Sequence, residues 1–497
     1  MIKKEFILFF LLIACFYLLR SGYMYLQHEE PRRAIVALEM NQSKNYLQPT
    51  VLGKAYFKKP PLHNIAIALS YKIFGKNAFA VRFPSILCAL LIAFFVFLFT
   101  KNILYEKSYI ACLSFLTCFE VFFLYGIWGE TDLFFSLFAF LSMISLFSFK
   151  KKGILLGLIF CSLAFLSKGF AALIFFYLTF IAYSLYKKRL ISHFFSIHHL
   201  LGILVFLGLT GFWLLHTSNA HASIYALWGE VFSRSPLQFS ILKFLKHIFL
   251  FPFKCFIQTL PWSIFLLFLF NKKVRTRIKE ISGRQKELLI FCLIVLGVNF
   301  IPYEISPEGR IRYLIPLLPF LSIFIAPIVS DLNEKEFKYA NYMWVIVCIL
   351  VIAAFFSDIF MLKNLTDGIL LLVLSIAVFS IPKRTLFPSI LCAMLILKVI
   401  HSYCYVPFVR AHYPNYKEMG EAIARNIKNY DKHKKIESND RFLKLMFYIE
   451  KDLPKMITPL SCKNSLIITR DVKAAKKGNI VYSLSTPHGI YYISSFK

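Results

Sequence analysis

Long apolar runs dominate the sequence, and short clusters of lysine and arginine separate them. Hydrophobic residues make up 58% of the 497 positions, and the mean hydropathy is +0.64. A soluble protein of this length needs more polar surface than this composition provides. Because an apolar helix of about 20 residues crosses the roughly 30 Å of hydrocarbon in a bilayer, the runs predict an α-helical polytopic membrane protein.

The apolar runs predict about 13 transmembrane helices. Their expected positions are 5–26, 80–100, 108–126, 132–149, 153–167, 169–186, 199–216, 249–270, 287–302, 312–329, 341–361, 367–381 and 386–406. If the N-terminus is inside, the connections KNILYEK, KKK, YKKRL, NKKVRTRIKEISGRQKE, DLNEKEFK and PKR all fall on the inner side. Cytoplasmic loops carry the excess of lysine and arginine, so we expect the N-terminus inside and the C-terminus outside.

The formal net charge of +31 at pH 7 agrees with this topology. The basic residues gather between apolar runs, where anionic lipid headgroups attract them, so membrane lipids are expected partners and nucleic acid is not. The 11 cysteines lie mostly inside apolar runs and form no CxxC pair. They are typical of small buried hydrophobic residues, and they predict neither a disulfide framework nor a metal site. The basic start and apolar core near the N-terminus resemble a signal peptide but lack a small-x-small cleavage site, which favours an uncleaved first span.

Two long connections fall on the outer side of the predicted membrane domain, which covers residues 1–406. Residues 27–79 join the first two spans, and residues 217–248 form a second outer loop. Within the first loop, the segment PPLHNIAIALSYKIFGKNAF places apolar residues at helical spacing. This pattern is typical of a helix that lies in the membrane interface. The residues that share its apolar face are Leu62, Ile65, Ala66, Leu69 and Ile73.

The composition changes to a polar tail at about residue 407. The segment NYKEMGEAIARNIKNY predicts a helix, while SLIITR, NIVYSLS and GIYYISSF predict strands. Residues 407–497 are therefore expected to form a small periplasmic α/β domain.

Several polar clusters interrupt the outer connections. In HEEPRR, Glu29 and Glu30 come directly before Pro31 at the expected start of a helix. Carboxylates there face the positive end of a helix dipole, so the pair fits either an N-cap or a catalytic centre. In YFKKPPL, Lys58 and Lys59 precede two prolines that stiffen the chain. These lysines fit either ordinary snorkelling at the interface or phosphate binding.

Three further clusters lie at the ends of predicted spans. WGETDLFF contains Glu130 and Asp132, LSKGF contains Lys168, and SPEGRIRYLIPLLP contains Arg310, Arg312 and Tyr313. Together the clusters place carboxylates and cations on one side of the membrane. That combination suits transfer from a lipid-linked sugar phosphate, because cations stabilise the departing phosphate and a carboxylate orients or deprotonates the acceptor.

The order of these motifs resembles the C-type superfamily of polytopic membrane glycosyltransferases. The resemblance is carried by PRRAIVALEM, KKPPLHNIAIALSYKIFGKNAFAVRFPS, GETDLFFSLFAFLS, LAFLSKGF and RYLIPLLPFL, in that order, within residues 5–330. The sequence is most similar to the bacterial branch that contains the aminoarabinose transferase of lipid A and the protein O-mannosyltransferases (dolichyl-phosphate-mannose-protein mannosyltransferases). This family implies inverting transfer from a polyprenyl-phosphate sugar, such as an undecaprenyl-phosphate sugar, at the periplasmic face of the bacterial inner membrane.

The resemblance also implies roles for individual residues. Glu29 and Glu30 stand where the family usually has Asp-Glu, and Asp132 matches an aspartate at the start of the fourth span. Lys59 matches the lysine that contacts the donor phosphate. At the preceding position, the aminoarabinose branch often has a glutamate that contributes to a metal site. Lys58 stands there in this chain, so a divalent metal is only weakly supported and no cofactor is assigned.

Four other residues complete the expected donor-phosphate site. Arg310, Arg312 and Tyr313 lie in the donor-binding region of the family, and Lys168 lies in the matching LSKGF motif. The expected acceptor is lipid A, lipopolysaccharide or another envelope glycan, and the alternative is a protein serine or threonine. A transporter or flippase of lipid-linked sugars is an alternative of another class, but the chain lacks the paired repeats with broken helices that many transporters have.

Overall fold

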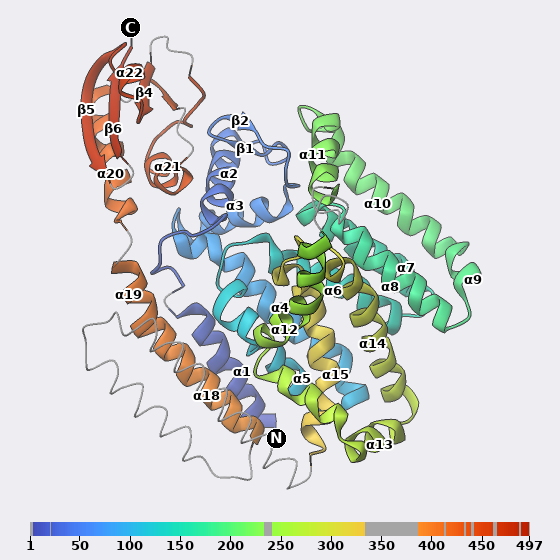
Figure 1. Ribbon diagram of the computed structural model, residues 1–497. Coiled ribbons are helices and arrows are strands. Elements are labelled where there is room, and N and C mark those ends of the chain that lie inside the picture. The colour runs from blue at the N-terminus through green and yellow to red at the C-terminus, as the bar shows by residue number, and fades with distance from the viewer. Residues whose placement is uncertain are drawn as a thin grey trace.

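The computed structural model describes residues 3–19, 21–232, 241–332, 386–411, 414–431, 434–438, 442–460, 465–486 and 489–496. The spans expected at 341–361 and 367–381 lie outside these residues. Helices build most of the described chain (Figure 1).

The first half of the helical body runs from α1 to α10. Its elements are α1 (Lys3–Leu18), α2 (Glu30–Ser43), α3 (Leu62–Phe74), α4 (Ala78–Leu104), α5 (Lys107–Leu116), a π-helix η1 (Glu120–Tyr125), α6 (Thr131–Ser148), α7 (Lys152–Lys168), α8 (Ala171–Tyr186), α9 (Leu190–Phe194) and α10 (Ile197–Leu215). A two-stranded hairpin, β1 (Thr50–Val51) with β2 (Lys54–Ala55), lies between α2 and α3.

The second half runs from α11 to α19. Its elements are α11 (Ala220–Phe232), α12 (Ile241–Gln258), a 3₁₀-helix η3 (Trp262–Phe270), α13 (Lys272–Glu280), α14 (Gly283–Glu304), a 3₁₀-helix η4 (Ile311–Leu317), α15 (Leu318–Ser330), α18 (Leu386–Ile400), a π-helix η5 (His401–Tyr405) and α19 (Val406–Ala411).

Five helical segments of the described chain are long and apolar enough to cross a membrane. They are Ala78–Leu104, Thr131–Ser148, Ile197–Leu215, Gly283–Glu304 and Ile311–Ser330. Their lengths and compositions agree with the polytopic membrane fold that hydropathy predicts. Figure 1 shows the N-terminus and α13 at the bottom, α9 at the right and the α/β tail at the upper left, so the tail lies at one end of the helical body.

Two expected spans are each broken into two pieces. The span expected at 108–126 divides into α5 and η1, because the Phe119 amide donates to the carbonyl of Leu260 at 2.8 Å instead of continuing the helix. The span expected at 249–270 divides between Gln258, where α12 ends, and Trp262, where η3 begins. In addition, α12 begins at Ile241, inside the segment that the sequence predicts as an outer loop.

The interfacial helix predicted in the first outer loop is present as α3. Its face with Leu69 and Ile73 is exposed, at 51% and 72%, while His63, Ile67 and Tyr71 are buried. An exposed apolar face of this kind is what a helix on a bilayer surface requires.

The tail contains the predicted helix and strands and three short elements that the sequence analysis does not include. The predicted elements are α20 (Tyr416–Asp431), β4 (Ser465–Thr469), β5 (Asn479–Thr486) and β6 (Gly489–Ser495). The additional ones are β3 (Lys435–Ser438), α21 (Leu443–Glu450) and α22 (Val472–Ala475). The sheet has the order β3-β4-β6-β5, with β3 parallel to β4 and the other pairs antiparallel.

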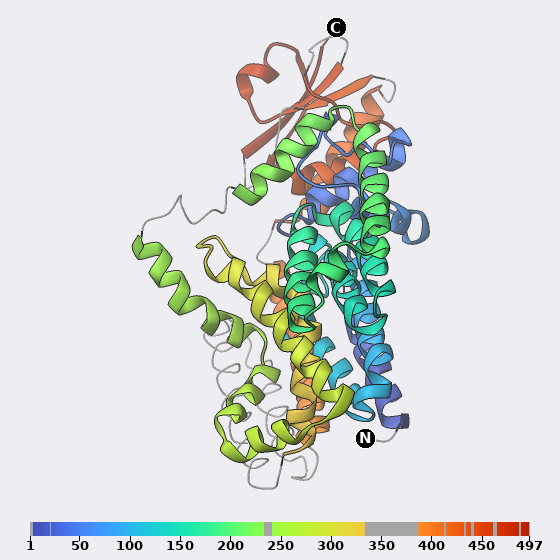
Figure 2. The same ribbon diagram turned by 90° about the vertical axis from the view of Figure 1, so that its right-hand side faces the viewer.

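The tail shares its hydrophobic core with the first outer loop. Ile35 and Leu38 of α2 belong to the same buried cluster as Ile423, Phe447 and Leu466 of the tail. Figures 1 and 2 both show the tail next to the start of α2 and α3 at one end of the molecule. The loop that carries the acidic pair is therefore held between the membrane body and the α/β tail.

Candidate active site

The two adjacent glutamates at the start of α2 occupy different environments. Glu30 is fully buried and binds Arg82 of α4 through two contacts, Nε to Oε1 at 2.7 Å and Nη2 to Oε2 at 2.8 Å. The amides of Gln27 and Gly129 also donate to the Glu30 carboxylate, each at 2.7 Å. Each described partner of this carboxylate is either Arg82 or a backbone amide, so Glu30 connects α2 to α4 and to the loop before α6.

Arg82 also binds the connection that follows α1. Its guanidinium donates to the carbonyl of Met24 and to that of Tyr25, each at 3.0 Å. The buried ion pair therefore fixes the loop that positions Glu29.

Glu29 faces a cavity of about 820 Å³. Its side chain is 38% exposed and forms an ion pair with Arg32, one turn along α2. The Glu29 amide donates to Oε1 of Glu130 at 3.2 Å. Burial raises the pKa of Glu130 to about 7, and the charge of Asp132 acts in the same direction. The cavity therefore contains one exposed carboxylate, Glu29, beside a second carboxyl group that titrates near neutral pH.

Asp132 and Lys168 form the centre of the cavity. Asp132 is the second residue of α6, and its Oδ1 lies 2.6 Å from Nζ of Lys168. Lys168 is the last residue of α7, because Gly169 takes the left-handed conformation with φ +84° and ends the helix. The Lys168 ammonium lies 4.9 Å from the centre of the Tyr313 ring, which adds a cation–π contact.

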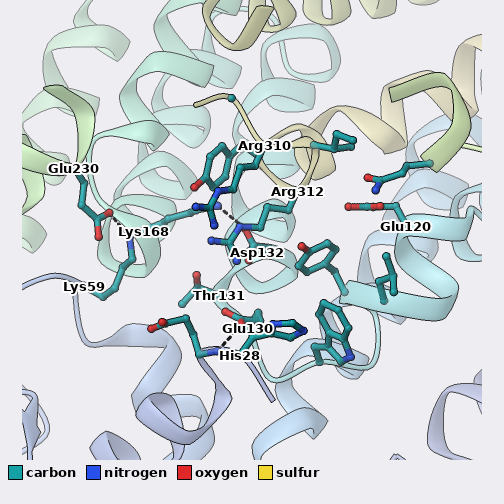
Figure 3. Close-up of a pocket in the computed structure, with 18 of the residues that line it drawn as sticks. His28, Lys59, Glu120, Glu130, Thr131, Asp132, Lys168, Glu230, Arg310 and Arg312 are labelled. Carbon is teal, nitrogen blue, oxygen red and sulfur yellow. Dashed lines mark hydrogen bonds and ion pairs between the residues drawn. The ribbon is translucent and has the colours of Figure 1, made fainter. Parts of the chain in front are cut away.

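Two arginines enter the cavity from the start of η4. Arg310 precedes η4 and Arg312 is its second residue, with the guanidinium 5.4 Å from the centre of the Tyr313 ring. Figure 3 shows Arg310, Arg312 and Lys168 gathered around Asp132. A cluster with three cations and one carboxylate attracts an anion.

Lys58 and Lys59 also line the cavity. Lys59 forms an ion pair with Glu230 of α11, and its side chain is 11% exposed. Burial lowers the pKa of Lys59 to about 8, although the charge of Glu230 opposes this fall. The two prolines that follow lead directly into α3, so the lysines are held at the junction of the loop and the interfacial helix.

The cavity brings together all but one of the residues predicted from sequence. Those that line it are Glu29, Lys58, Lys59, Asp132, Lys168, Arg310, Arg312 and Tyr313. The exception is Glu30, which binds Arg82 behind the cavity wall.

Other lining residues had no assigned role in the sequence analysis. Arg33 is 3% exposed, donates to the Tyr56 hydroxyl at 3.2 Å and lines the cavity. Glu230 reaches the site from the second outer loop. It is the only carboxylate in residues 217–248, which was an available signal. Glu120 and Gln258 line a part of the cavity away from Asp132, as the position of Glu120 in Figure 3 shows.

In the described part of the chain, three acidic side chains of the cavity are arranged as partners of cations. Within the described ranges, no three His, Cys, Asp or Glu side chains are grouped so that they could hold a metal ion. Asp132, Glu29 and Glu230 are each paired with a cation. Lys58 contributes a positive charge at the position where the resemblance would place a metal ligand.

The chain is similar to known membrane transferases. Residues 58–216 match the family described as dolichyl-phosphate-mannose-protein mannosyltransferase. The undecaprenyl phosphate-α-4-amino-4-deoxy-L-arabinose arabinosyl transferase of Wigglesworthia glossinidia brevipalpis is 30% identical over 356 residues, which are 66% of this chain and 58% of the relative. The enzyme of the same description from Aeromonas hydrophila is 27% identical over 350 residues, 65% of this chain and 61% of the relative. The match thus spans about three fifths of the length of these curated relatives.

The fold is also that of a solved structure. ArnT from Cupriavidus metallidurans bound to undecaprenyl phosphate superposes with a TM-score of 0.77 at 16% identity, covering 99% of this chain and 98% of that one. Its apo form gives a TM-score of 0.73 at 15% identity. These matches agree with the resemblance that the ordered motifs carry: the chain is similar to the aminoarabinose transferases and, over residues 58–216, to the dolichyl-phosphate-mannose-protein mannosyltransferase family.

Proposed function

We propose that this chain is an inverting glycosyltransferase of the bacterial inner membrane. It moves a sugar from an undecaprenyl-phosphate donor to lipid A, lipopolysaccharide or another envelope glycan at the periplasmic face. One observation carries the proposal: eight lysine and arginine side chains and an exposed carboxylate, Glu29, line one cavity at the end of the apolar helices. The cations are Arg32, Arg33, Lys58, Lys59, Lys168, Lys254, Arg310 and Arg312.

The cations suit the leaving group. When the bond between the anomeric carbon and the phosphate oxygen breaks, its electron pair and a developing negative charge pass to the phosphate. Lys168 and Arg312 are already held in place by Asp132 and Tyr313, so little rearrangement is needed to meet this charge. Lys59 supplies a further cation once the phosphate competes with Glu230 for its ammonium group.

The carboxylate suits the acceptor. The acceptor oxygen forms the new bond to the anomeric carbon from the face opposite the phosphate, which inverts the configuration. If the acceptor is a hydroxyl group, its proton passes to Glu29. If it is a lipid A phosphate, it is already nucleophilic, and Glu29 and Arg32 orient it.

The distribution of charge supports the periplasmic assignment. The basic connections 150–152, 187–189 and 272–279 lie at the end of the helices away from the cavity. Lysine and arginine are enriched in cytoplasmic loops, so the cavity is assigned to the outer side.

The direct test is sugar transfer by the purified chain in detergent. The donor is undecaprenyl-phosphate aminoarabinose, chosen from the relatives, and the acceptor is lipid A. We expect a product of increased mass with the wild type, none with Lys168→Met, and wild-type yield with the matched control Lys272→Met in α13. Transfer in detergent needs no second compartment, so it also excludes a flippase as the sole function. The absence of transfer with all lipid-linked sugars tested would reject the enzyme assignment.

Protein serine or threonine is the second candidate acceptor, because the matched family is described as a protein mannosyltransferase family. Mass spectrometry of lipid A and of envelope proteins from a deletion strain separates the two. A sugar missing from lipid A supports the first acceptor, and one missing only from proteins supports the second.

A further inference from the structure

A second cavity, of about 750 Å³, lies at the other end of the helical body. Its wall includes Phe147 near the end of α6, whereas Asp132 in the candidate active site lies at the beginning of the same helix. The 18 residues of α6 span about 27 Å, so the two cavities are separated by roughly the thickness of the hydrocarbon layer. Figure 1 shows the same separation, with α9 at the far end of α10 from α11.

Cations from two connections converge on this second cavity. Lys150 and Lys151 come from the turn between α6 and α7, Lys152 is the first residue of α7, and Lys187 and Arg189 come from the connection between α8 and α9. Among the described residues that line the cavity, Glu287 has the single carboxylate.

The Glu287 carboxylate already has two partners. Glu287 forms an ion pair with Lys187 and accepts a hydrogen bond from the Tyr183 hydroxyl at 3.2 Å. In the part of the chain that the structure describes, the side chains of Lys150–Lys152 and Arg189 form no ion pair. The cavity therefore has several uncompensated positive charges.

Two histidines extend the polar wall. Burial lowers the pKa of His193, and the charges of Arg189 and Lys151 act in the same direction, so cations from the two connections lie near one imidazole. His193 Nδ1 pairs with the Ser184 hydroxyl at 3.0 Å. His198 Nδ1 is buried and, among the described residues, has no hydrogen-bond partner. The site thus offers an unused polar atom together with its cations.

The surroundings of the cavity are apolar. Phe149, in the wall, is 44% exposed. From the same end, α10 exposes Ile197, Leu200 and Leu204 at 59%, 53% and 55%, at spacings of three and four residues. These side chains form a stripe along one face of the helix, next to the mouth of a basic cavity. An occupant with an anionic head and an aliphatic tail fits both surfaces, whereas a free phosphate uses only the cavity.

We propose that this cavity is a binding site for an anionic phospholipid, with the phosphate headgroup among Lys150–Lys152, Arg189 and His198 and an acyl chain along α10. Basic pockets between helices at the cytoplasmic surface are suited to such headgroups. A bound lipid would tie the α6–α7 turn to the end of α8 and the start of α10.

The test compares lipid binding by the purified full-length chain. The protein is reconstituted in nanodiscs of phosphatidylcholine with and without phosphatidylglycerol, and lipid retained after delipidation is counted by native mass spectrometry. The variants are Lys150→Ser/Lys151→Ser/Lys152→Ser and the charge-conserving Lys150→Arg/Lys151→Arg/Lys152→Arg. The matched control, Lys272→Ser/Lys273→Ser/Arg275→Ser, removes three cations of α13 that do not line the cavity.

The serine variant is expected to retain phosphatidylglycerol roughly a hundredfold more weakly than the wild type, since each of the three cations near the surface contributes about 1 kcal/mol. The arginine variant and the α13 control are expected to bind as the wild type does. Equal losses in the serine variant and the α13 control would show general attraction to the membrane surface and overturn the proposal. So would loss of binding in the arginine variant, or displacement of the lipid by inorganic phosphate as effectively as by the lipid headgroup.

Discussion

Glu29 and Glu30 are adjacent in the chain, yet the structure predicts opposite consequences for their substitution by glutamine. Glu30→Gln changes the buried centre of an ion pair, whereas Glu29→Gln changes an exposed group in the cavity. The comparison is matched, because both variants alter one carboxylate at the start of the same helix.

The loss of stability expected for Glu30→Gln follows from the partners of its carboxylate. Its carboxylate accepts two bonds from Arg82 and one from each of the amides of Gln27 and Gly129. Glutamine removes the negative charge and turns one acceptor into a donor that faces other donors, which leaves the arginine buried without its counter-charge. Removal of one partner from a buried ion pair costs about 3–5 kcal/mol, so we expect a loss of about 3 kcal/mol in the free energy of unfolding.

Glu29→Gln is expected to change the stability little and to lower the activity strongly. Its ion pair with Arg32 is partly exposed on both sides, and exposed pairs contribute at most about 1 kcal/mol. Under the proposed function, Glu29→Gln removes the group that binds or deprotonates the acceptor. Loss of general-base catalysis lowers the rate by about 10²- to 10⁴-fold.

Both quantities can be measured on one preparation. Unfolding in detergent, followed by tryptophan fluorescence, gives stability, and transfer of a labelled sugar gives activity. The reasoning fails if the two variants unfold alike, or if Glu30→Gln is as stable as the wild type and inactive. In the second case Glu30, and not Glu29, would be the catalytic carboxylate.

Three further outcomes follow from the charges in the structure. Lys59 has a pKa of about 8, so the affinity for undecaprenyl phosphate is expected to fall as pH rises through that value, in a binding titration followed by intrinsic fluorescence. Lys59→Arg keeps its charge at high pH, so this fall in affinity should be absent from the variant. Glu230→Gln removes a charge that favours the ammonium form of Lys59, so the fall in affinity should move to lower pH. An unchanged pH dependence of the affinity would show that another group titrates. Glu39 of α2 and Glu450 of α21 are both buried; burial raises the pKa of Glu39 from 4.5 to about 6, and burial together with the charge of Glu39 raises the pKa of Glu450. Because the folded state holds its protons to higher pH than the unfolded one, stability is greatest below pH 4.5 for this pair and falls as pH rises through about 6. The fall attributable to Glu39 is about 2 kcal/mol, and Glu39→Gln should flatten the pH dependence of the unfolding midpoint.

Local sequence patterns predicted the elements whose structure depends on local interactions. The apolar periodicity of 62–73 gave α3, and the β-branched and aromatic runs of the tail gave β4, β5 and β6. The break after α5 was not predicted, because it depends on a hydrogen bond from Phe119 to Leu260, 141 positions further along the chain.

The same distinction applies to the candidate site. The order of the motifs predicted Lys59, Asp132 and Lys168 as site residues, and each of them lines the cavity. It left Glu29 and Glu30 undecided, because the difference between them depends on Arg82 and on the amide of Gly129, far along the chain. Pattern identifies which side chains are unusual, whereas long-range partners determine which of them face the cavity.

The core shared by α2 and the tail has a consequence for biosynthesis. Ile35 and Leu38 are synthesised about 400 positions before Phe447 and Leu466, which complete their surroundings. Domains generally fold as their chain is made, but this unit cannot close until the tail has been synthesised. The core around α2 therefore stays incomplete while the intervening helices are made. A chain that ends before the tail is expected to insert its spans and still lack an ordered loop around Glu29, so synthesis of the tail is a required step in the assembly of the candidate site.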